Sequence, residues 1–582
     1  MNLCRPARIK YLHIILFKKA AAKSLRRDFA LHLYGMKSAF LLLCVAGIFF
    51  TACNPSSNHH KTRTVFRYNE INGLTSLDPA GASSLENIWP VNQLFNGLLE
   101  MDDSLNLLSS IAKNWEISQD GKTYTFYLRS DVYFHDDSCF NNSKGRAVIA
   151  GDFVFSFNRL YDSRVSSAAS LLFHLDQNKG KRGIEAQNDT ILKVYLNEPF
   201  SAFASILTMK YFSVVPHEAV HMYGDNFRRH PVGTGPFVFK TWQEGTRLVL
   251  LKNEKYFEYD SAGVRLPYLD AVSVSYMRDR ETAFMEMLGG KFDMLSGADA
   301  FNTHEVLDRH GELKDIYSSK FFLQKANFLK TDYIGILVDE SLPAVKNSPV
   351  RHKLIRQAIN YSFDRKKLVK YLRNNLGSPA LSGFIPPGMK SYDPNKVRGY
   401  DYDPAKARRL LSEAGYPNGQ GLPPLILHVS DNYREQVEFI QSQLISNNIP
   451  VEVSIEKTPV LQQAVKRGEY ALFKKSWVAD YADEENFMSL FYSKNFSPEG
   501  VNYFHYANPL FDSLYVKGLT MAPGEEKTQL YQQMERIVLE DAPYIAMYYD
   551  NIIRLVSYEV EGLSTNPMNL LNLKKVKKHK KG

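Results

Sequence analysis

The sequence predicts an α/β fold, and three patterns support that prediction. Residues 424–457 pass from a strand to a helix and back to a strand, the unit from which α/β proteins are built. Residues 350–369 place their apolar side chains along one helical stripe. Within 111–134, an Asp-Gly pair separates two runs of alternating character, as in a β-hairpin. The 582 residues, 44% of them hydrophobic, are enough for two or three domains with separate cores.

The elements expected in the N-terminal half follow from periodicity and turn residues. They are a strand at 64–70, a helix at 85–99, the hairpin at 111–134, a helix at 151–160 and a strand at 191–200. A PVGTGP turn follows at 231–236, where two glycines allow another strand to approach closely. No Lys-Ser/Thr pair and no helix follow its second glycine, so a phosphate-binding loop is not expected.

The C-terminal half alternates helices with strands. Asp403-Pro404 is typical of a helix start, and Gly415 is typical of a helix end. The expected elements are a helix at 350–369, a helix at 404–415, a strand at 424–430, a helix at 433–447, a strand at 451–457, a short helix at 461–470 and a long strand at 541–556.

The stretch 474–487 holds the strongest candidate for a binding group. A strand is expected at 468–478, and a helix is expected to begin with Asp483 as its N-cap. Asp480 lies between them, beside Trp477 and Tyr481. Two aromatic faces that exclude water would strengthen a charge-assisted hydrogen bond from this carboxylate to a cation. The alternative is a solvated acid in a turn.

The N-terminal region resembles an export signal. About twelve apolar residues at 39–50 follow a lysine, too few for a membrane-spanning helix, which needs about 20. The run ends in Phe-Thr-Ala-Cys at 50–53, similar to the lipobox of bacterial lipoproteins, so we expect Cys53 to be lipidated. Met36 is then the expected start of translation, and 1–35 an upstream extension. The alternative is a short buried helix.

Charge and cysteine content exclude other classes. The net charge of +9 comes from residues 1–52 and from six lysines in 574–581, and the body between them is slightly acidic. A nucleic-acid-binding surface is therefore not expected. Of the four cysteines, only Cys139 would remain as a free thiol after processing and lipidation. An exported body without an intramolecular disulfide has to be held together by its core.

One motif suggests catalysis. His217 and His221 frame an HEAVH sequence, in which two imidazoles share one helical face with a glutamate beside them, as in zinc peptidases. Pro216 and Gly224 limit this helix to about two turns, whereas a zinc peptidase needs a long helix and a third ligand. No GxSxG sequence occurs. We expect no enzyme, no cofactor and no metal, with a zinc hydrolase as the alternative.

An ordered series of motifs resembles a known family. LDP, NWEISQDGKTYTFYLR, DFVFSFNRL, PVGTGPF, LKNEKYF, GGKFDM, FIPPGM and YDYDPAKARRLLSEAGYPNG occur in the order and spacing of the solute-binding proteins of peptide-type ABC importers. These are the oligopeptide- and dipeptide-binding proteins of family 5. The resemblance covers roughly residues 64–570.

The resemblance implies a two-lobed periplasmic-binding-protein type II fold with an extra α+β subdomain. Two strand crossings, near Tyr333 and near 543–549, would form the hinge. The implied segments are an upstream extension and signal at 1–52, a lipid-anchored tether at 53–63, lobe I at 64–100, 206–330 and 541–570, the extra subdomain at 101–205, lobe II at 331–540 and a basic tail at 571–582. We expect this tail to be a disordered, solubilising end.

The resemblance also implies a site. Asp480 matches the aspartate that pairs with the α-ammonium of a bound peptide, and its neighbours match as well. The other expected ligand contacts are Trp477, Tyr481, Tyr433, Tyr333, Ser83 and Tyr548, with Lys474 and Arg434 as cations for the ligand carboxylate.

The expected function is the capture of short peptides by hinge closure and their delivery to the permease and ATPase of an ABC transporter. The protein would be a monomer, anchored to a membrane by its N-terminal lipid, and facing the periplasm or the cell exterior. One alternative keeps the fold but changes the solute to a metal chelate, a sugar or a cell-wall peptide.

Overall fold

The computed structural model describes residues 63–166, 168–172 and 174–579. The expected signal, Cys53 and the tether as far as Thr62 lie outside the described residues. Residues 63–582 form one compact unit. Among the described residues, no helix is both long and apolar enough to span a bilayer.

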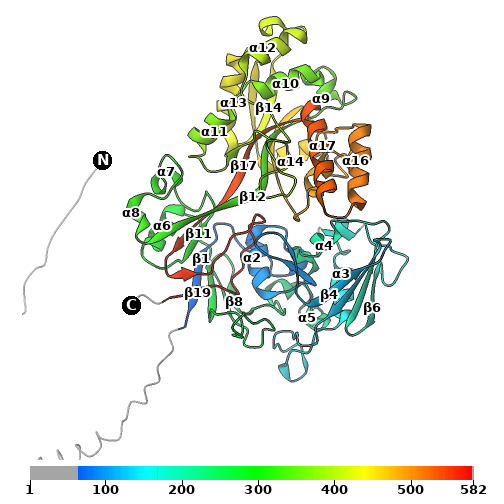
Figure 1. The fold of residues 1–582 in the computed structure, drawn as a ribbon. Helices are drawn as coiled ribbons and strands as arrows, with labels where there is room; N and C mark the ends of the chain where they lie inside the picture. Colours follow the sequence, from blue (N-terminus) through cyan, green and yellow to red (C-terminus); the bar gives the residue numbers. More distant parts are fainter. Residues whose placement is uncertain (1–62, 167, 173, 580–582) are drawn as a thin grey trace, which may run out of the picture. The chain divides into compact units, whose positions relative to one another are not determined.

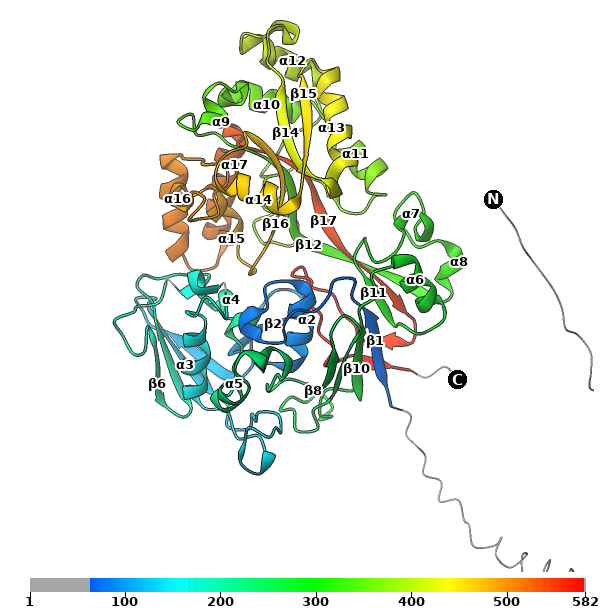
Figure 2. The same cartoon turned by 180° about the vertical axis from the view of Figure 1, so that it is seen from behind.

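A single mixed sheet of eleven strands runs through this unit. Its two longest strands, β12 (Phe321–Ile336) and β17 (Tyr544–Ser557), lie antiparallel at its centre and run together between an upper and a lower lobe (Figures 1 and 2). In order across the sheet the strands are β15 (Val451–Glu456), β14 (Leu425–Ser430), β16 (Leu472–Val478), β12, β17, β11 (Met294–Ser296), β1 (Val65–Asn69), β10 (Ala271–Ser275), β9 (Arg247–Lys252) and β8 (Phe237–Gln243), with the short β13 (Ser378–Pro379) on β17.

We call the part with β1 and β8–β11 lobe I and the part with β14–β16 lobe II. The pairing of β12 with β17 is interrupted between Asn327 and Thr331, and again at Asp332 and Tyr333. Tyr333 itself pairs with Ala546 and is completely buried, so it belongs to the regular sheet of lobe II. The longer break in pairing therefore lies a few residues before the crossing predicted near Tyr333, and the second irregularity lies at it.

A separate four-stranded antiparallel sheet forms the extra subdomain. The hairpin expected at 111–134 is present as β4 (Ala112–Ile117) and β5 (Thr123–Leu128). Its turn needs Gly121, whose φ of 69° is in the left-handed region that favours glycine. The order is β4, β5, β7 (Ile191–Tyr195) and β6 (Ile184–Asn188), and α3 (Ala150–Arg159) packs on β6 and β7.

The helices of lobe II cover its part of the sheet. The prediction of a single helix at 350–369 is wrong, because the first helix ends at Tyr361 and a second one begins at Arg365. Asp364 caps the second helix, since its carboxylate accepts from the Lys367 N–H. The lobe II helices are α9 (Pro343–Lys346), α10 (Lys353–Tyr361), α11 (Arg365–Leu372), α12 (Pro404–Glu413), α13 (Arg434–Ser446), α14 (Thr458–Lys466), α15 (Glu485–Met488), α16 (Pro509–Thr520) and α17 (Glu525–Asp541).

The remaining elements belong to the lower part of the sheet and the extra subdomain. They are α2 (Leu85–Leu94), β2 (Leu99–Met101), β3 (Leu107–Ser109), α4 (Phe203–Ile206), α5 (His217–Tyr223), α6 (Arg280–Leu288), α7 (Thr303–Val306), α8 (Asp315–Ser318), β18 (Val560–Glu561) and β19 (Lys577–Lys578). One large core joins lobe I with the extra subdomain, and lobe II has two cores of its own.

The basic tail is part of lobe I. Leu571, Leu573 and Val576 are fully buried in its core, and β19 pairs with β18. Lys574 is also buried and bonds to two carboxylates, Glu100 at 2.8 Å and Glu258 at 2.8 Å. The expectation of a disordered tail is therefore wrong for 571–579. The sequence did not reveal the packing because both acidic partners lie more than 300 residues upstream.

We expect Lys574→Met to destabilise the protein by about 3 kcal/mol, because removing one partner of a buried ion pair leaves uncompensated charge. Two carboxylates, Glu100 and Glu258, would lose their cation. The loss of stability can be measured by thermal and by urea unfolding. Lys575→Met is the matched control, since Lys575 is exposed. Equal stability of the two variants would mean that the tail adds nothing to lobe I.

Candidate functional site

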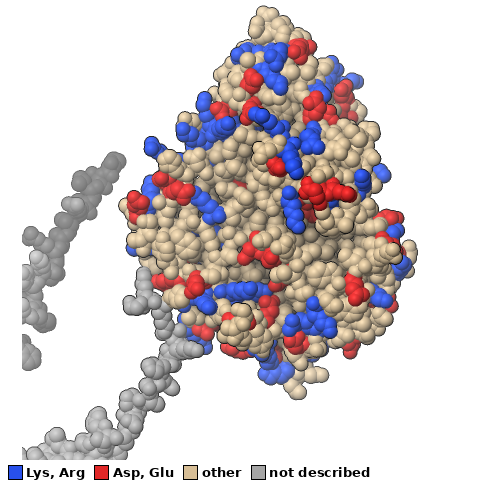
Figure 3. Space-filling model, viewed as in Figure 1, with Lys and Arg blue, Asp and Glu red and all other residues tan. Residues whose placement is uncertain are grey.

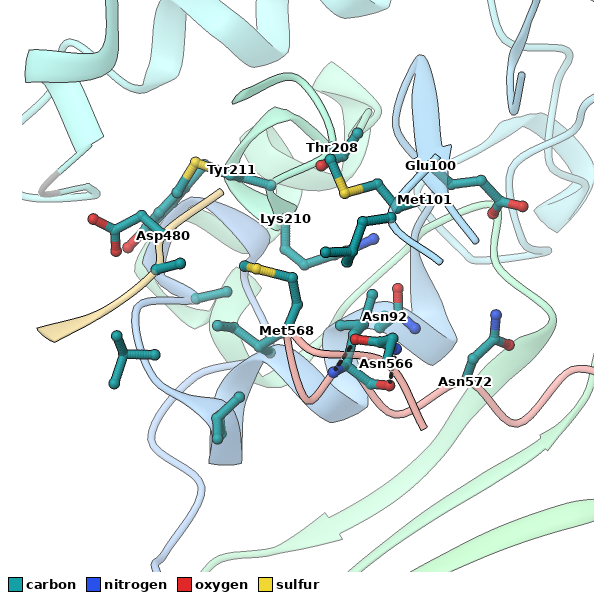
Figure 4. Close-up of a pocket in the computed structure, with 18 of the residues that line it drawn as sticks. Asn92, Glu100, Met101, Thr208, Lys210, Tyr211, Asp480, Asn566, Met568 and Asn572 are labelled. Atoms are coloured by element: carbon teal, nitrogen blue, oxygen red, sulfur yellow. Dashed lines mark hydrogen bonds between the residues drawn. The ribbon is translucent and has the colours of Figure 1, made fainter. Parts of the chain in front are cut away.

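A cavity of about 420 Å³ lies where lobe I meets the end of β16 (Figure 4). Its volume lies in the range of small-molecule sites, about 300–1,000 Å³. Most of its wall is apolar and includes three methionines, whose thioethers adapt to irregular ligand shapes. The residues that line it include Ser83, Leu85, Glu100, Met101, Asp102, Met209, Lys210, Tyr211, Phe328, Lys330, Asp480 and Met568.

Asp480 reaches this cavity from the turn that follows β16. Asn486 fixes the turn, because its Oδ1 accepts from the Asp480 backbone N–H at 3.2 Å and from the Trp477 indole N–H at 3.0 Å. The Asp480 carboxylate forms no ion pair with any described residue. Asp480 is an exposed residue that is open to the cavity, and desolvation by the protein beside it raises the pKa of its carboxyl group.

The aromatic neighbours of Asp480 do not form the walls that the sequence predicted. Tyr481 is buried, and its hydroxyl donates to the carboxylate of Glu485, which also accepts from Tyr515. Trp477 packs at the edge of a lobe II core. Neither ring lines the cavity. The two side chains instead hold the turn in place, and the walls beside Asp480 are the small residues Val478 and Ala479.

A second, wider cavity of about 760 Å³ adjoins the first. Leu85, Phe328 and Lys330 line both, so the two spaces share one wall. Two of the predicted contacts, Tyr433 and Tyr548, line only the wider cavity. Ser83 lines only the first one, with Asp480. The four predicted contacts that line one of these cavities are thus divided between two adjoining spaces.

Lys474 does not reach either cavity. Its ammonium is completely buried, 2.7 Å from Asp332, and lies over the ring of Tyr433. Lys330 lies 3.2 Å from the same carboxylate and 2.8 Å from Asp550. Burial alone would raise the pKa of Asp332, but Lys474 and Lys330 hold it well below the ordinary value. The charge of Lys474 is thereby compensated inside lobe II, contrary to its expected role toward a ligand.

Two further predicted contacts lie away from the cavities. Arg434 is half exposed on α13, where it bonds to Asp431 at 3.1 Å and lies 3.8 Å from Glu438. Tyr333 packs in the lobe II core between Phe384 and Phe504. Neither lines either of these two cavities.

With this geometry in place, the chain can be compared with known proteins. It matches the model of the bacterial extracellular solute-binding proteins, family 5, over residues 106–498. The chain belongs to this family. The predicted family is thus confirmed.

Individual relatives agree with this assignment. The glutathione-binding protein GsiB of Escherichia coli O1:K1 is 27% identical over 503 residues, which cover 85% of this chain and 90% of that protein. Among solved structures, DppA from Helicobacter pylori in complex with the peptide STSA is similar with a TM-score of 0.72 and 25% identity, covering 90% of this chain and all of that one. HbpA2 from Haemophilus parasuis has a TM-score of 0.74 at 22% identity, over 88% and 99% of the chains. The predicted two-lobed fold class is confirmed.

In this family-5 protein the HEAVH sequence forms α5, in the lower part of the structure. Arg146 donates to both Glu218 oxygens, at 2.6 and 2.9 Å, and to both oxygens of Asp152. The glutamate that would act as a base is therefore held in an ion pair with an arginine. Among the described residues, no group of three or more His, Cys, Asp or Glu side chains is arranged to hold a metal ion.

Several charged residues of the cavities were missed by the sequence analysis, and three of them are Lys210, Arg373 and Glu70. Lys210 lines the first cavity, and Arg373 and Glu70 line the second. Burial, followed by the charge of Glu86, raises the pKa of Glu70 to about 7. No local pattern marks these residues, because an isolated charged side chain beside apolar ones is common on protein surfaces.

Glu70 predicts a pH-dependent contribution to stability. Its folded pKa exceeds the unfolded value of 4.5, so its ionisation costs stability as the pH rises from below 4.5 through about 7. We expect Glu70→Gln to remove that cost and to gain on the order of 2 kcal/mol at pH 8, with little gain at pH 4.5. Urea unfolding at both pH values measures the difference.

The exposed Glu499 provides the control, and Glu499→Gln should show no such pH dependence. A Glu70→Gln variant whose gain is the same at pH 4.5 and pH 8 would contradict a raised pKa for this residue.

Proposed function

We propose that this protein captures short peptides outside the cytoplasm and delivers them to the permease of an ABC transporter, acting without catalysis. The observation that supports this most directly is Asp480, an acid in a small cavity that no described cation neutralises. Membership of the solute-binding family supports the transport role. A similar protein, DppA from Helicobacter pylori, has been solved with the peptide STSA.

Asp480 suits the recognition of a peptide N-terminus. Every unmodified peptide carries an α-ammonium, so one acid can bind many peptides without contacting their side chains. The surrounding protein weakens solvent screening, which strengthens the attraction between the two charges. The adaptable methionine side chains of the cavity wall allow different ligand side chains to pack against them. The combination favours a receptor of broad peptide specificity.

Closure of the two lobes would couple binding to transport. Phe328 and Lys330 lie in the interrupted part of the β12–β17 pairing and line both cavities. Strand backbone whose pairing is interrupted on one side bends more easily than backbone paired on both sides, so we place the hinge at this interruption with β17. A ligand that contacts Ser83 of lobe I and Asp480 of lobe II stabilises the closed form, which the permease would recognise.

The proposal includes export and a lipid anchor at Cys53, which would keep the protein beside its permease and ATPase. The body would work as a monomer without a cofactor. GsiB is named for glutathione, a tripeptide with an unusual first linkage, so glutathione belongs among the candidate ligands. Sugars and metal chelates without an amine would make no use of Asp480.

We expect Asp480→Asn to weaken peptide binding by about 2–5 kcal/mol, roughly 30- to several-thousand-fold, since the ammonium loses its charged partner. Isothermal titration against the best binder of a di- to hexapeptide library measures the change. Acetylating the N-terminus of the same peptide should have a similar effect on the wild-type protein.

Asp225→Asn, on an exposed residue of lobe I, serves as the control and should bind as the wild type does. If acetylated and free peptides bind the wild-type protein equally well, Asp480 does not bind the ammonium. If no peptide binds while an amine-free solute does, the peptide assignment fails.

A further inference from the structure

Lys210, like Asp480, lines the small cavity and lacks a charged partner among the described residues. It begins a short 3₁₀ turn, Lys210–Phe212, and its neighbours Met209 and Tyr211 line the same space. Figure 4 shows its side chain extending into the cavity from lobe I, while Asp480 enters from the end of a lobe II strand. The two groups come from different lobes and lie apart, so a single ligand has to reach from one to the other.

The acids near Lys210 are already bonded to other groups. Both oxygens of Glu100 accept from Lys574, at 2.8 and 3.0 Å. The Asp102 carboxylate accepts from the backbone N–H groups of Ser104 and Asn106 and from the Asn106 side chain. No described residue forms an ion pair with Lys210. The buried lysine of the tail thus compensates the acid that would otherwise be the partner of Lys210.

The other lysine of the cavity wall differs in this respect. Lys330 lies 2.8 Å from Asp550 and 3.2 Å from Asp332, so its charge is compensated within the protein. Among the described residues that line the small cavity, Lys210 is therefore the cation without an ion pair. Two acids of this cavity, Asp102 and Asp480, have no ion pair with a described residue. The Asp102 carboxylate is bonded to Ser104 and Asn106, so Asp480 is the counterpart of Lys210.

Desolvation acts on these two groups in opposite directions. Burial lowers the pKa of Lys210 to about 8, with smaller effects from Glu100 and Lys574, and it raises the pKa of Asp480. Lys210 still carries its proton for most of the time at neutral pH. A desolvated ammonium without a partner costs free energy, and a bound anion reduces that cost.

We infer that Lys210 binds the carboxylate of the ligand whose ammonium is held by Asp480, so that the substrates are short zwitterionic peptides with a free C-terminus. This inference rests on the proposed function and adds a limit to it. A cavity of about 420 Å³ with one charge contributed by each lobe selects for a ligand that bears both charges and is short enough to fit between them. Amidated peptides would lack one of the two contacts.

The inference assigns the contact with the ligand carboxylate to a different residue. Sequence resemblance had indicated Lys474 and Arg434, both on lobe II. The structure leaves the first paired with Asp332 and the second on the surface. A cation on lobe I has a functional consequence, because a ligand with both charges then bridges the lobes at two separate points. Such a ligand stabilises the closed form more than one that is held by its ammonium alone.

The test compares peptide acids with their C-terminal amides by isothermal titration at pH 7. The probes are Ser-Thr-Ser-Ala, trialanine and glutathione, each against the corresponding amide. For the wild-type protein we expect the acid to bind at least ten times more tightly than the amide. For Lys210→Met we expect the acid to bind as weakly as the amide, with the affinity for the amide changed less than threefold.

Arg434→Gln is the matched control, and it should preserve the wild-type ratio of acid to amide affinity. Lys210→Arg keeps the charge and should retain part of the preference. If Lys210→Met does not fold, the wild-type ratio and the Lys210→Arg variant still decide the matter. Thermal unfolding shows which variants are folded before any titration.

Three results would overturn the inference. The first is equal affinity of the wild-type protein for acid and amide. The second is loss of the preference for the acid in Arg434→Gln, and the third is an equal loss of affinity for acid and amide in Lys210→Met. Failure of the proposed function gives a different result, since neither acids nor amides would then bind the wild-type protein.

Discussion

The pairing of β12 with β17 is the interaction on which the rest of the structure depends. These two strands belong to both lobes, and every other strand of the large sheet reaches the opposite lobe only through them. The interruption between Asn327 and Thr331 brings Phe328 and Lys330 to the shared wall of both cavities. In the proposed function, the feature that lets the lobes move would thus form part of the binding space, and a bound ligand would contact the hinge.

Several charged groups around the two cavities are paired within the protein itself. Asp332 and Asp550 bind the lysines and the arginine of the hinge region, and Lys574 binds the acids of lobe I. Figure 3 shows a similar balance on the surface, where acidic and basic side chains are interspersed over the face in view. Against this background the uncompensated Asp480 and Lys210 stand out. A receptor that offers an open acid and an open cation at separate points gains selectivity, since a solute with the wrong charge at either point finds no partner.

The tail illustrates how a remote segment affects the site. Sequence composition marks 571–582 as a run of lysines, which suggests solvation. In the folded protein its apolar residues alternate into the lobe I core, and Lys574 removes Glu100 as a partner of Lys210. The tail therefore contributes to lobe stability and to the charge of the cavity at the same time. Neither effect is visible without the contacts between residues hundreds of positions apart.

The sequence by itself determined the elements and the family. Local patterns were sufficient for the hairpin at Gly121, for the strand that leads to Asp480 and for the α/β unit of lobe II, because periodicity and turn chemistry act over a few residues. The exception was the helix expected at 350–369, where the capping ability of Asp364 outweighed the continuous apolar stripe. Asp480 was singled out by its aromatic neighbours in the chain together with the family resemblance, and its role toward a ligand stays a prediction.

Only the tertiary structure decided which charged side chains remain open. The sequence resemblance indicated Lys474 and Arg434 and did not indicate Lys210, yet the first is paired with Asp332, the second lies on the surface and the third lines the cavity. Asp332 lies 142 residues before Lys474 in the chain, and the sheet brings the two together. Electrostatic energy depends on separation in space and on exclusion of water, and neither quantity is encoded in the local order of residues.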